Sequence, residues 1–381
     1  MPEPVKNGND LPPPCKHSRI VSLDYVRVLL TLSILIYHMA ADYKTAFPES
    51  ASTMDHIINY TNGPWGPVIV TMFFMLSGIG LYHKHKSIDN VWSFYYKRWK
   101  SIIPLFYIVY VVFYINHCFA IGHIFYKDPP LTILLTILGM DCYSGQNVPL
   151  SPLLQWIVGG TPSGTYYLTG TWFLGPILIV YLLYPLILIL YKKLNYLLLI
   201  GLALLYFLEM RYTPYDTNRT IIYCLVGFVA GMIFIDNIHL MKDWRLVISS
   251  IMIATPILLL KLPSFVLYPH IIAFCILIIS YNLWEQVSKK QTRLNMAILK
   301  LSTLSFSFFL IHIGTNKYVK IYLMSSYDIG FVECVIISTV FDLLLSVILY
   351  KLHTLLIHSK YFLKFEDTII RLGSKKPIMI R

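Results

Sequence analysis

Residues 19–39, RIVSLDYVRVLLTLSILIYHM, form an apolar run long enough to cross a membrane as a helix, yet they carry Asp24, Arg27 and His38. Arg27 and His38 are eleven residues apart. At about 100° and 1.5 Å per residue, this spacing returns the two side chains to within roughly 20° of one face, about 16 Å apart along the axis. We therefore expect one helix to present a fixed cation and a titratable imidazole along the same line.

Two interpretations of this stretch are open. Ionisable groups are costly at membrane depth, and where they occur they usually face a protein interior or a wet cavity and mark a functional site. Alternatively, Asp24 and Arg27 form an i,i+3 ion pair that only anchors the helix at the water interface, and His38 is a structural histidine at the opposite interface.

The composition of the whole chain is that of a polytopic membrane protein. Of 381 residues, 56% are hydrophobic and 13% are charged, and the mean hydropathy is +0.63. The net charge of +12 comes from basic residues spread over short segments between apolar runs, which indicates membrane orientation and not a nucleic-acid partner. The six cysteines show no metal-ligand or redox spacing, so we expect neither a metal site nor a disulfide framework.

The apolar runs predict an all-α bundle of about ten transmembrane helices, near residues 20–42, 66–83, 101–121, 172–191, 195–209, 220–235, 246–260, 267–284, 298–314 and 331–353. With both termini cytoplasmic, 23 of the 31 Lys and Arg residues lie inside and 7 outside, and Arg27 lies within the first span. The run 131–140 is too short to span and is interpreted as interfacial or re-entrant. The predicted organisation is a cytoplasmic tail (1–18), a transmembrane domain (19–355) and a basic cytoplasmic tail (356–381).

Several motifs occur in the order of a known family. LDYVRVLLTLSILIYH (23–38) resembles the opening signature of the acyltransferase 3 family of integral membrane acyltransferases, with Arg and His separated by ten residues. FFMLSGIGL (73–81), FYYKRWKSIIPLFY (94–107), TWFLGPILIVYLLYP (171–185) and SFSFFLIH (305–312) are similar to later family motifs. One position departs from the family pattern, because Ser101 stands where another arginine is common.

The resemblance implies acyl-CoA as donor substrate, with no permanently bound cofactor. Phosphates need cations, and Arg27, Lys97, Arg98 and Lys100 are expected to supply them at the cytoplasmic face. Positive-inside topology alone would also explain Lys97 and Lys100.

The resemblance also assigns roles at the catalytic centre, to which Asp24 and Arg27 belong as well. His38 is expected to act as a general base for an acceptor hydroxyl or as a transient acyl carrier. His312 is expected to orient a substrate hydroxyl or His38, and Trp172 to stack on a sugar ring. The alternatives are an interfacial structural histidine and a membrane aromatic belt. Asp342, in the middle of the last span, needs a partner that the sequence does not identify.

The expected function is transfer of an acetyl or other short acyl group from acyl-CoA to a hydroxyl of a cell-envelope or secreted polysaccharide or its lipid-linked precursor. The expected location is the cytoplasmic membrane, with the bilayer, the glycan acceptor and other envelope polysaccharide assembly proteins as partners. A multi-span transporter or acyl-group translocator is the alternative. A carrier is expected to show repeat symmetry and broken helices, and neither is evident in the sequence. A non-catalytic sensor built on the same fold is a third possibility.

Overall fold

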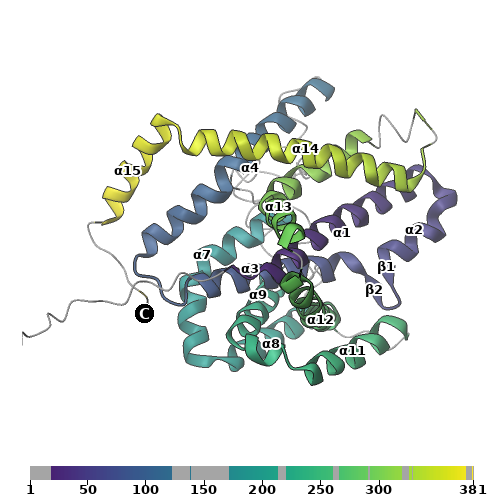
Figure 1. Ribbon diagram of the computed structural model, residues 1–381, viewed down its shortest axis with the longest axis horizontal. Coiled ribbons are helices and arrows are strands. Elements are labelled where there is room, and N and C mark those ends of the chain that lie inside the picture. Colours follow the sequence, from purple (N-terminus) through teal and green to yellow (C-terminus); the bar gives the residue numbers. More distant parts are fainter. Residues whose placement is uncertain are drawn as a thin grey trace, which may run out of the picture.

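Each of the ten apolar segments coincides with a helix in the computed structural model of the chain (Figure 1). The structure describes residues 19–121, 138, 171–212, 220–260, 266–290, 292–319, 326–327, 329–374 and 380. The ten helices are α1 (Val21–Ala46), α3 (Trp65–Lys84), α4 (Val91–Ile121), α7 (Thr171–Leu194), α8 (Tyr196–Tyr212), α9 (Ile221–Asp236), α11 (Trp244–Leu259), α12 (Tyr268–Lys290), α13 (Thr292–Val319) and α14 (Phe331–Ile357).

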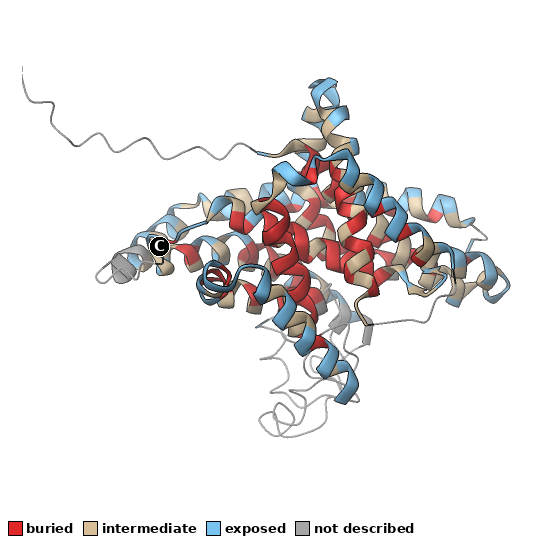
Figure 2. Cartoon of the chain, turned by 90° about the horizontal axis from the view of Figure 1, so that it is seen from below, coloured by how far each residue is buried: buried red, intermediate tan, exposed pale blue. Residues whose placement is uncertain are grey.

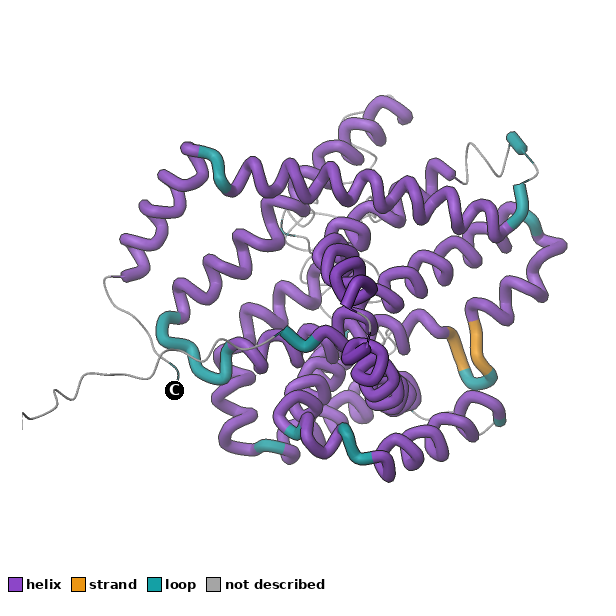
Figure 3. The backbone as a smooth tube through the Cα atoms, in the orientation of Figure 1, coloured by secondary structure: helices purple, strands orange, loops and turns teal. Residues whose placement is uncertain are grey.

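Short elements connect or flank these helices: η1 (Pro48–Ser50), α2 (Ala51–Ile58), β1 (Asn59–Tyr60), β2 (Gly63–Pro64), α10 (Ile238–Met241) and α15 (Lys360–Ser374). The two strands pair as an antiparallel hairpin between α2 and α3, and the rest of the regular structure described is helical (Figure 3). The prediction of an all-α helical bundle is confirmed.

Among the residues that the structure describes, seven helices are long and apolar enough to cross a membrane: α1, α3, α4, α7, α12, α13 and α14. The apolar helices α9 and α11 are shorter, with 16 residues each. The chain is therefore a multi-pass membrane protein. The exact number of spans and the side on which each terminus lies stay predictions, and nearly all of the run 131–140 lies outside the described residues.

Glycines bring α3 and α9 into backbone contact at the centre of the bundle. A Cβ atom on Gly78 would collide with the carbonyl oxygen of Phe228, and one on Gly231 would collide with that of Met75. Small residues allow such close helix approach in membrane proteins. Gly78, which follows Ser77 in the second sequence motif, therefore serves helix packing.

The bundle buries its middle helices and exposes apolar side chains at its periphery (Figure 2). Helix α1 lies at the centre and contacts α3, α12, α13 and α14. The outward faces of α8, α11 and α14 carry exposed Leu, Ile and Val residues. This is the arrangement expected of a protein whose surrounding solvent is lipid.

The predicted C-terminal tail contains α15, which packs against α4. Lys100 Nζ lies 2.6 Å from a carboxylate oxygen of Glu366, and the Trp99 ring stacks on Phe362. Trp92 Nε1 donates to the Ile369 carbonyl at 3.0 Å. The segment after α14 is therefore attached to the bundle along the start of α4.

Candidate active site

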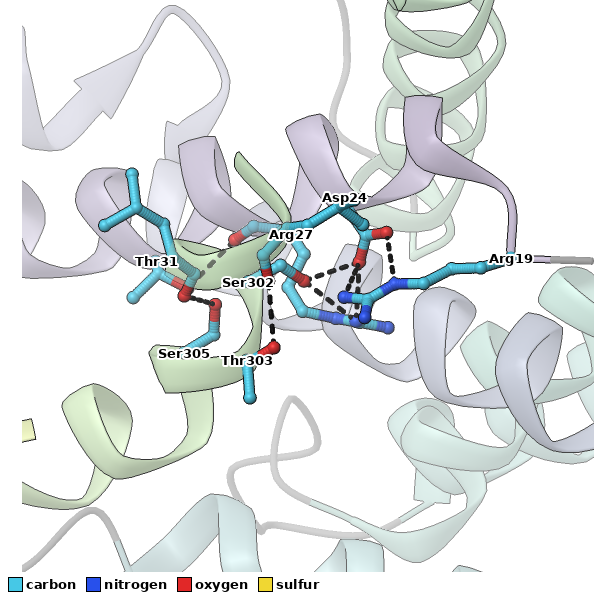
Figure 4. A network of polar contacts seen from close by, with 9 residues as sticks. Arg19, Asp24, Arg27, Thr31, Ser302, Thr303 and Ser305 are labelled. Atoms are coloured by element: carbon cyan, nitrogen blue, oxygen red, sulfur yellow. Dashed lines mark hydrogen bonds and ion pairs between the residues drawn. The ribbon is translucent and has the colours of Figure 1, made fainter. Parts of the chain in front are cut away.

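Asp24 is buried and is the centre of a polar network that joins α1 to α13 (Figure 4). Arg19 donates to its carboxylate from Nε at 2.7 Å and from Nη2 at 2.9 Å. Arg27 Nη1 donates to Asp24 Oδ1 at 3.2 Å and to Ser302 Oγ at 3.1 Å. Ser302 Oγ in turn donates to Asp24 Oδ1 at 2.5 Å. The expected Asp24–Arg27 pair is present, and its hydrogen bonds with Ser302 tie it to a second helix.

The network carries a net positive charge, because two guanidinium groups share one carboxylate. The hydrogen bond with Asp24 raises the pKa of Arg19, which lies just before α1, above its ordinary value. Arg19 thus remains a cation and compensates Asp24. The charge of Arg27 is therefore available to a further anion.

A cavity of about 380 Å³ lies beside this network, between α1, α3, α4, α7 and α13. Its volume lies in the range of roughly 300–1,000 Å³ that is usual for small-molecule sites. Arg27 and Arg98 both line it, together with Ser101 and Tyr181. The Nε of Arg98 is buried and has no hydrogen-bond partner within the described part of the chain. Two cations, one with an unpaired donor, suit the cavity to an anionic ligand.

Helix α13 presents four site residues on one face. Ser302, Ser305 and Phe309 line the cavity, and His312 continues the same face. Their spacing of three, four and three residues follows the helical period, so these side chains form one stripe along α13.

At the end of this stripe, His312 meets His38 of α1. Their ring centroids are 5.4 Å apart. His312 Nδ1 lies 2.6 Å from the Phe309 carbonyl oxygen. Because a carbonyl oxygen only accepts, Nδ1 carries the proton and leaves Nε2 of the neutral ring as an acceptor. This Nε2 is buried without a hydrogen-bond partner among the described residues, so it is placed to accept a proton.

Asp42 stands one helical turn beyond His38 on α1, close enough to interact with it electrostatically. A carboxylate near an imidazole stabilises the imidazolium and orients the ring. The histidine pair therefore has an acidic neighbour on α1 and a backbone anchor on α13.

Three phenylalanines lie between the cationic end of the cavity and the histidine pair. Phe73, Phe173 and Phe309 all line the cavity. The Phe173 and Phe309 centroids are 4.9 Å apart, and the Phe309 centroid is 5.5 Å from that of His312. A ligand whose charged end binds the arginines would thus direct its other end towards the aromatic rings and the histidines.

The structure separates the cations predicted to bind the donor. Arg27 and Arg98 line the cavity, whereas Lys97 is exposed and Lys100 pairs with Glu366 of α15. The side chain of Trp172 lies outside the described residues, although its backbone belongs to α7. Within the described ranges, no group of three or more His, Cys, Asp and Glu side chains is placed to hold a metal ion.

Sequence reasoning missed Arg19, Asp42 and Ser302 as site residues. The hydroxyl-bearing residues in the apolar run before His312 were a signal, because they lie on its helical face. Asp42 was detectable from its i,i+4 spacing to His38. Arg19 gave no signal, since a basic residue just before a span is explained by membrane orientation alone.

Comparison with protein families gives the chemical class of this site. The model of the acyltransferase 3 family, described as an acyltransferase domain, matches residues 20–351 and so includes both the arginines and the histidine pair. Searches of curated proteins and of solved structures give no match. The resemblance drawn from the sequence motifs is confirmed. The chain belongs to the acyltransferase 3 family and is a membrane acyltransferase.

Proposed function

We propose that the chain transfers an acetyl or other short acyl group from acyl-CoA to a hydroxyl of a cell-envelope or secreted polysaccharide or its lipid-linked precursor. The observation that carries the proposal is one cavity that begins at Arg27 and Arg98 and ends at Phe309, whose ring contacts His312. Acyl-CoA has the matching polarity, with phosphates at one end and an uncharged thioester at the other.

At the cationic end, the phosphates of the donor would bind Arg27 and Arg98. The Nη1 of Arg27 is occupied by Asp24 and Ser302, which leaves the Nε and Nη2 donors for a ligand. Such a pair of N–H groups fits two phosphate oxygens at once. Ser101 stands where the family commonly has another arginine. Arg98 compensates for the missing cation, because it lines the same cavity.

At the histidine end, His38 would remove the proton from the acceptor hydroxyl as its oxygen attacks the thioester carbonyl carbon. The new ester C–O bond forms, the C–S bond breaks, and the CoA thiolate leaves. The thiolate takes one proton from the solvent and the His38 imidazolium returns one to it, so the histidine is again neutral. His312 would hold His38 or the hydroxyl in place through Nε2, and Asp42 would stabilise the charged imidazole.

In the proposed orientation both termini are cytoplasmic, so the arginines face the cytoplasmic pool of acyl-CoA and His38 lies towards the outer face. This location requires the cytoplasmic membrane. It places the glycan acceptor and other polysaccharide assembly proteins on the side of His38, while the donor enters from the opposite side.

The test compares surface polysaccharide from cells that express the wild type, His38→Ala or His56→Ala. His56 is an exposed histidine of α2 and serves as the matched control. Proton NMR before and after mild alkali should show alkali-labile acyl signals with the wild type and His56→Ala and none with His38→Ala. Identical spectra from all three strains would reject the polysaccharide acceptor and favour the translocator alternative.

A further inference from the structure

Helix α14 has polar residues on its buried face and apolar residues on its exposed face. Ser338, Asp342 and Ser346 are completely buried, and their spacing of four residues forms one stripe. Val340 and Leu344, between them in sequence, are exposed. In a lipid-surrounded bundle a buried polar stripe does not serve solubility, and each of its polar atoms needs a partner.

Most polar atoms of this stripe have no partner within the described residues. Thr315 of α13 donates to Asp342 Oδ1 at 2.5 Å. The other oxygen of Asp342, both serine hydroxyls and both amide atoms of the buried Asn316 side chain lack a hydrogen bond there. Because the group contains donors as well as acceptors, it calls for a ligand that can both donate and accept.

The missing hydrogen bonds of Ser338 and Ser346 are not a general property of hydroxyl side chains on the helices of this chain. Ser77, Ser250 and Thr339 each donate to the backbone carbonyl four residues earlier. Thr339 belongs to α14 itself and is the direct neighbour of Ser338. The hydroxyls of Ser338 and Ser346 make no such bond, so they are available to a ligand on the Asp342 side of the helix.

Water fits this stripe better than a metal ion does. Ser338 and Ser346 are eight residues apart, which is about 12 Å along the axis. One ion cannot touch both, whereas a file of about four hydrogen-bonded waters at roughly 2.8 Å spacing spans that length. A buried water usually makes two to four hydrogen bonds to such unpaired groups.

The stripe borders the turn of α13 that carries His312. Thr315, which donates to Asp342, lies 3.0 Å from the His312 carbonyl oxygen, and Asn316 is one helical turn beyond His312. His312 Nε2 is unpaired within the same described region. We infer that Ser338, Asp342 and Ser346, with Asn316, form a hydrated path that carries protons away from the His38–His312 pair.

This inference rests on the proposed function for the origin of the proton. His38 becomes an imidazolium when it takes the acceptor hydroxyl proton. The proton passes from His38 to His312 Nε2, while His312 Nδ1–H stays on the Phe309 carbonyl. It then leaves Nε2 for a water of the stripe and for the Asp342 carboxylate, which releases it through further waters to bulk solvent. The histidine returns to its neutral form, and the net reaction remains thioester plus alcohol to ester plus thiol.

The first experiment tests hydration and does not depend on acyl transfer. Thermal unfolding of the purified full chain in nanodiscs is compared for the wild type, the Ser338→Ala/Ser346→Ala double variant and the control Thr339→Ala. If the hydroxyls bind water, the double variant should unfold a few degrees lower than the wild type and lower than the control. Unfolding at an equal or higher temperature would overturn the hydrated path, because removing an unpaired hydroxyl from a dry site does not destabilise it.

The second experiment tests proton transfer with Asp342→Asn, which keeps the shape of the side chain and an oxygen for Thr315. CoA binding should be unchanged, the acyl-transfer rate should fall at least tenfold, and the solvent deuterium isotope effect on that rate should increase. Small weak acids such as azide should partly restore the rate. The relay would be refuted if Asp342→Asn transferred acyl groups at the wild-type rate. It would also be refuted if transfer by the wild type required sodium and transfer by Asp342→Asn did not. If even the wild type produced no acylated glycan, the proposed function would be refuted, and the relay with it. The unfolding experiment would still decide whether the stripe binds water.

Discussion

Replacing Arg27 by lysine isolates the contribution of the guanidinium fork from that of the charge. Arginine has five N–H donors and lysine has three. Two donors on Arg27 Nη1 hold Asp24 and Ser302, which leaves three for a ligand. If lysine keeps both protein contacts, only one donor remains, so one or two charge-assisted hydrogen bonds to phosphate are lost.

Each hydrogen bond to a charged group contributes about 1.5–3 kcal/mol. The Arg27 side chain is 36% exposed, so we take the lower end of that range for one lost bond. Arg27→Lys should therefore weaken CoA binding at least about tenfold, since roughly 1.4 kcal/mol corresponds to a factor of ten. The fold should be retained, because the ion pair with Asp24 survives.

The assay is calorimetric titration of the chain in nanodiscs with CoA and, separately, with pantetheine, which has no phosphate. The loss should appear for CoA and not for pantetheine. Arg245→Lys is the matched control, because Arg245 lies over Trp244 on α11 and does not line the cavity. Wild-type affinity of Arg27→Lys for CoA would refute bidentate phosphate binding, and an equal loss for pantetheine would show that the cavity itself had changed.

Four further predictions test the bundle and the site. Gly78→Ala should destabilise the protein by about 1–3 kcal/mol, because the added Cβ meets the backbone of α9. Gly201→Ala, where the space is open, should not destabilise it. Equal unfolding temperatures of the two variants would contradict the close contact of α3 with α9. Asp42→Asn should lower acyl transfer about tenfold or more with CoA affinity intact, and an unchanged rate would remove Asp42 from the site. Lys100→Met should loosen α15, seen as faster proteolysis of the C-terminal segment, with CoA affinity unchanged; a weaker affinity would return Lys100 to the donor site. A cysteine at Thr61, in a background without native cysteines, should react with an impermeant thiol reagent from outside, and reaction only after permeabilisation would reverse the orientation.

The sequence predicted those parts of the site that lie along one helix. Arg27 and His38 were placed on one face of α1 by their spacing alone, and in the structure both contact the same neighbour, α13. The length of the apolar runs also predicted the ten apolar helices, because a run of membrane length is a strong signal in a sequence.

Contacts between distant helices were not predictable in the same way. Ser302 bonds with Asp24 across 278 residues, and no local pattern identifies its partner. Lys100 was predicted to bind the donor because acyl-CoA carries phosphates and Lys100 lies in a basic stretch at the inner end of a span, and this role stays a prediction. Its pairing with Glu366 depends on the docking of α15, which the sequence suggested only as a basic tail.

The directions of contacting helices bear on the number of membrane crossings. Asp24, near the start of α1, meets Ser302 of α13, and His38 meets His312 further along both helices, so the two helices run in the same direction. Two spans with the same direction require an odd number of crossings between them. The described apolar helices between α1 and α13 are α3, α4, α7, α8, α9, α11 and α12, which is seven.

The same reasoning applies to α3 and α9, whose contacts run in register from Thr71–Tyr223 to Gly78–Phe228. Three described apolar helices, α4, α7 and α8, separate them, again an odd number. If α8 alone failed to cross, both parallel contacts would be inconsistent with the alternation of spans. The parallel contacts are therefore consistent with the ten crossings predicted from the sequence, in which α8 must cross if the other nine helices do. Helix direction also explains the site, because only a parallel α1 and α13 can place Ser302 beside Arg27 and His312 beside His38 at opposite ends of one path.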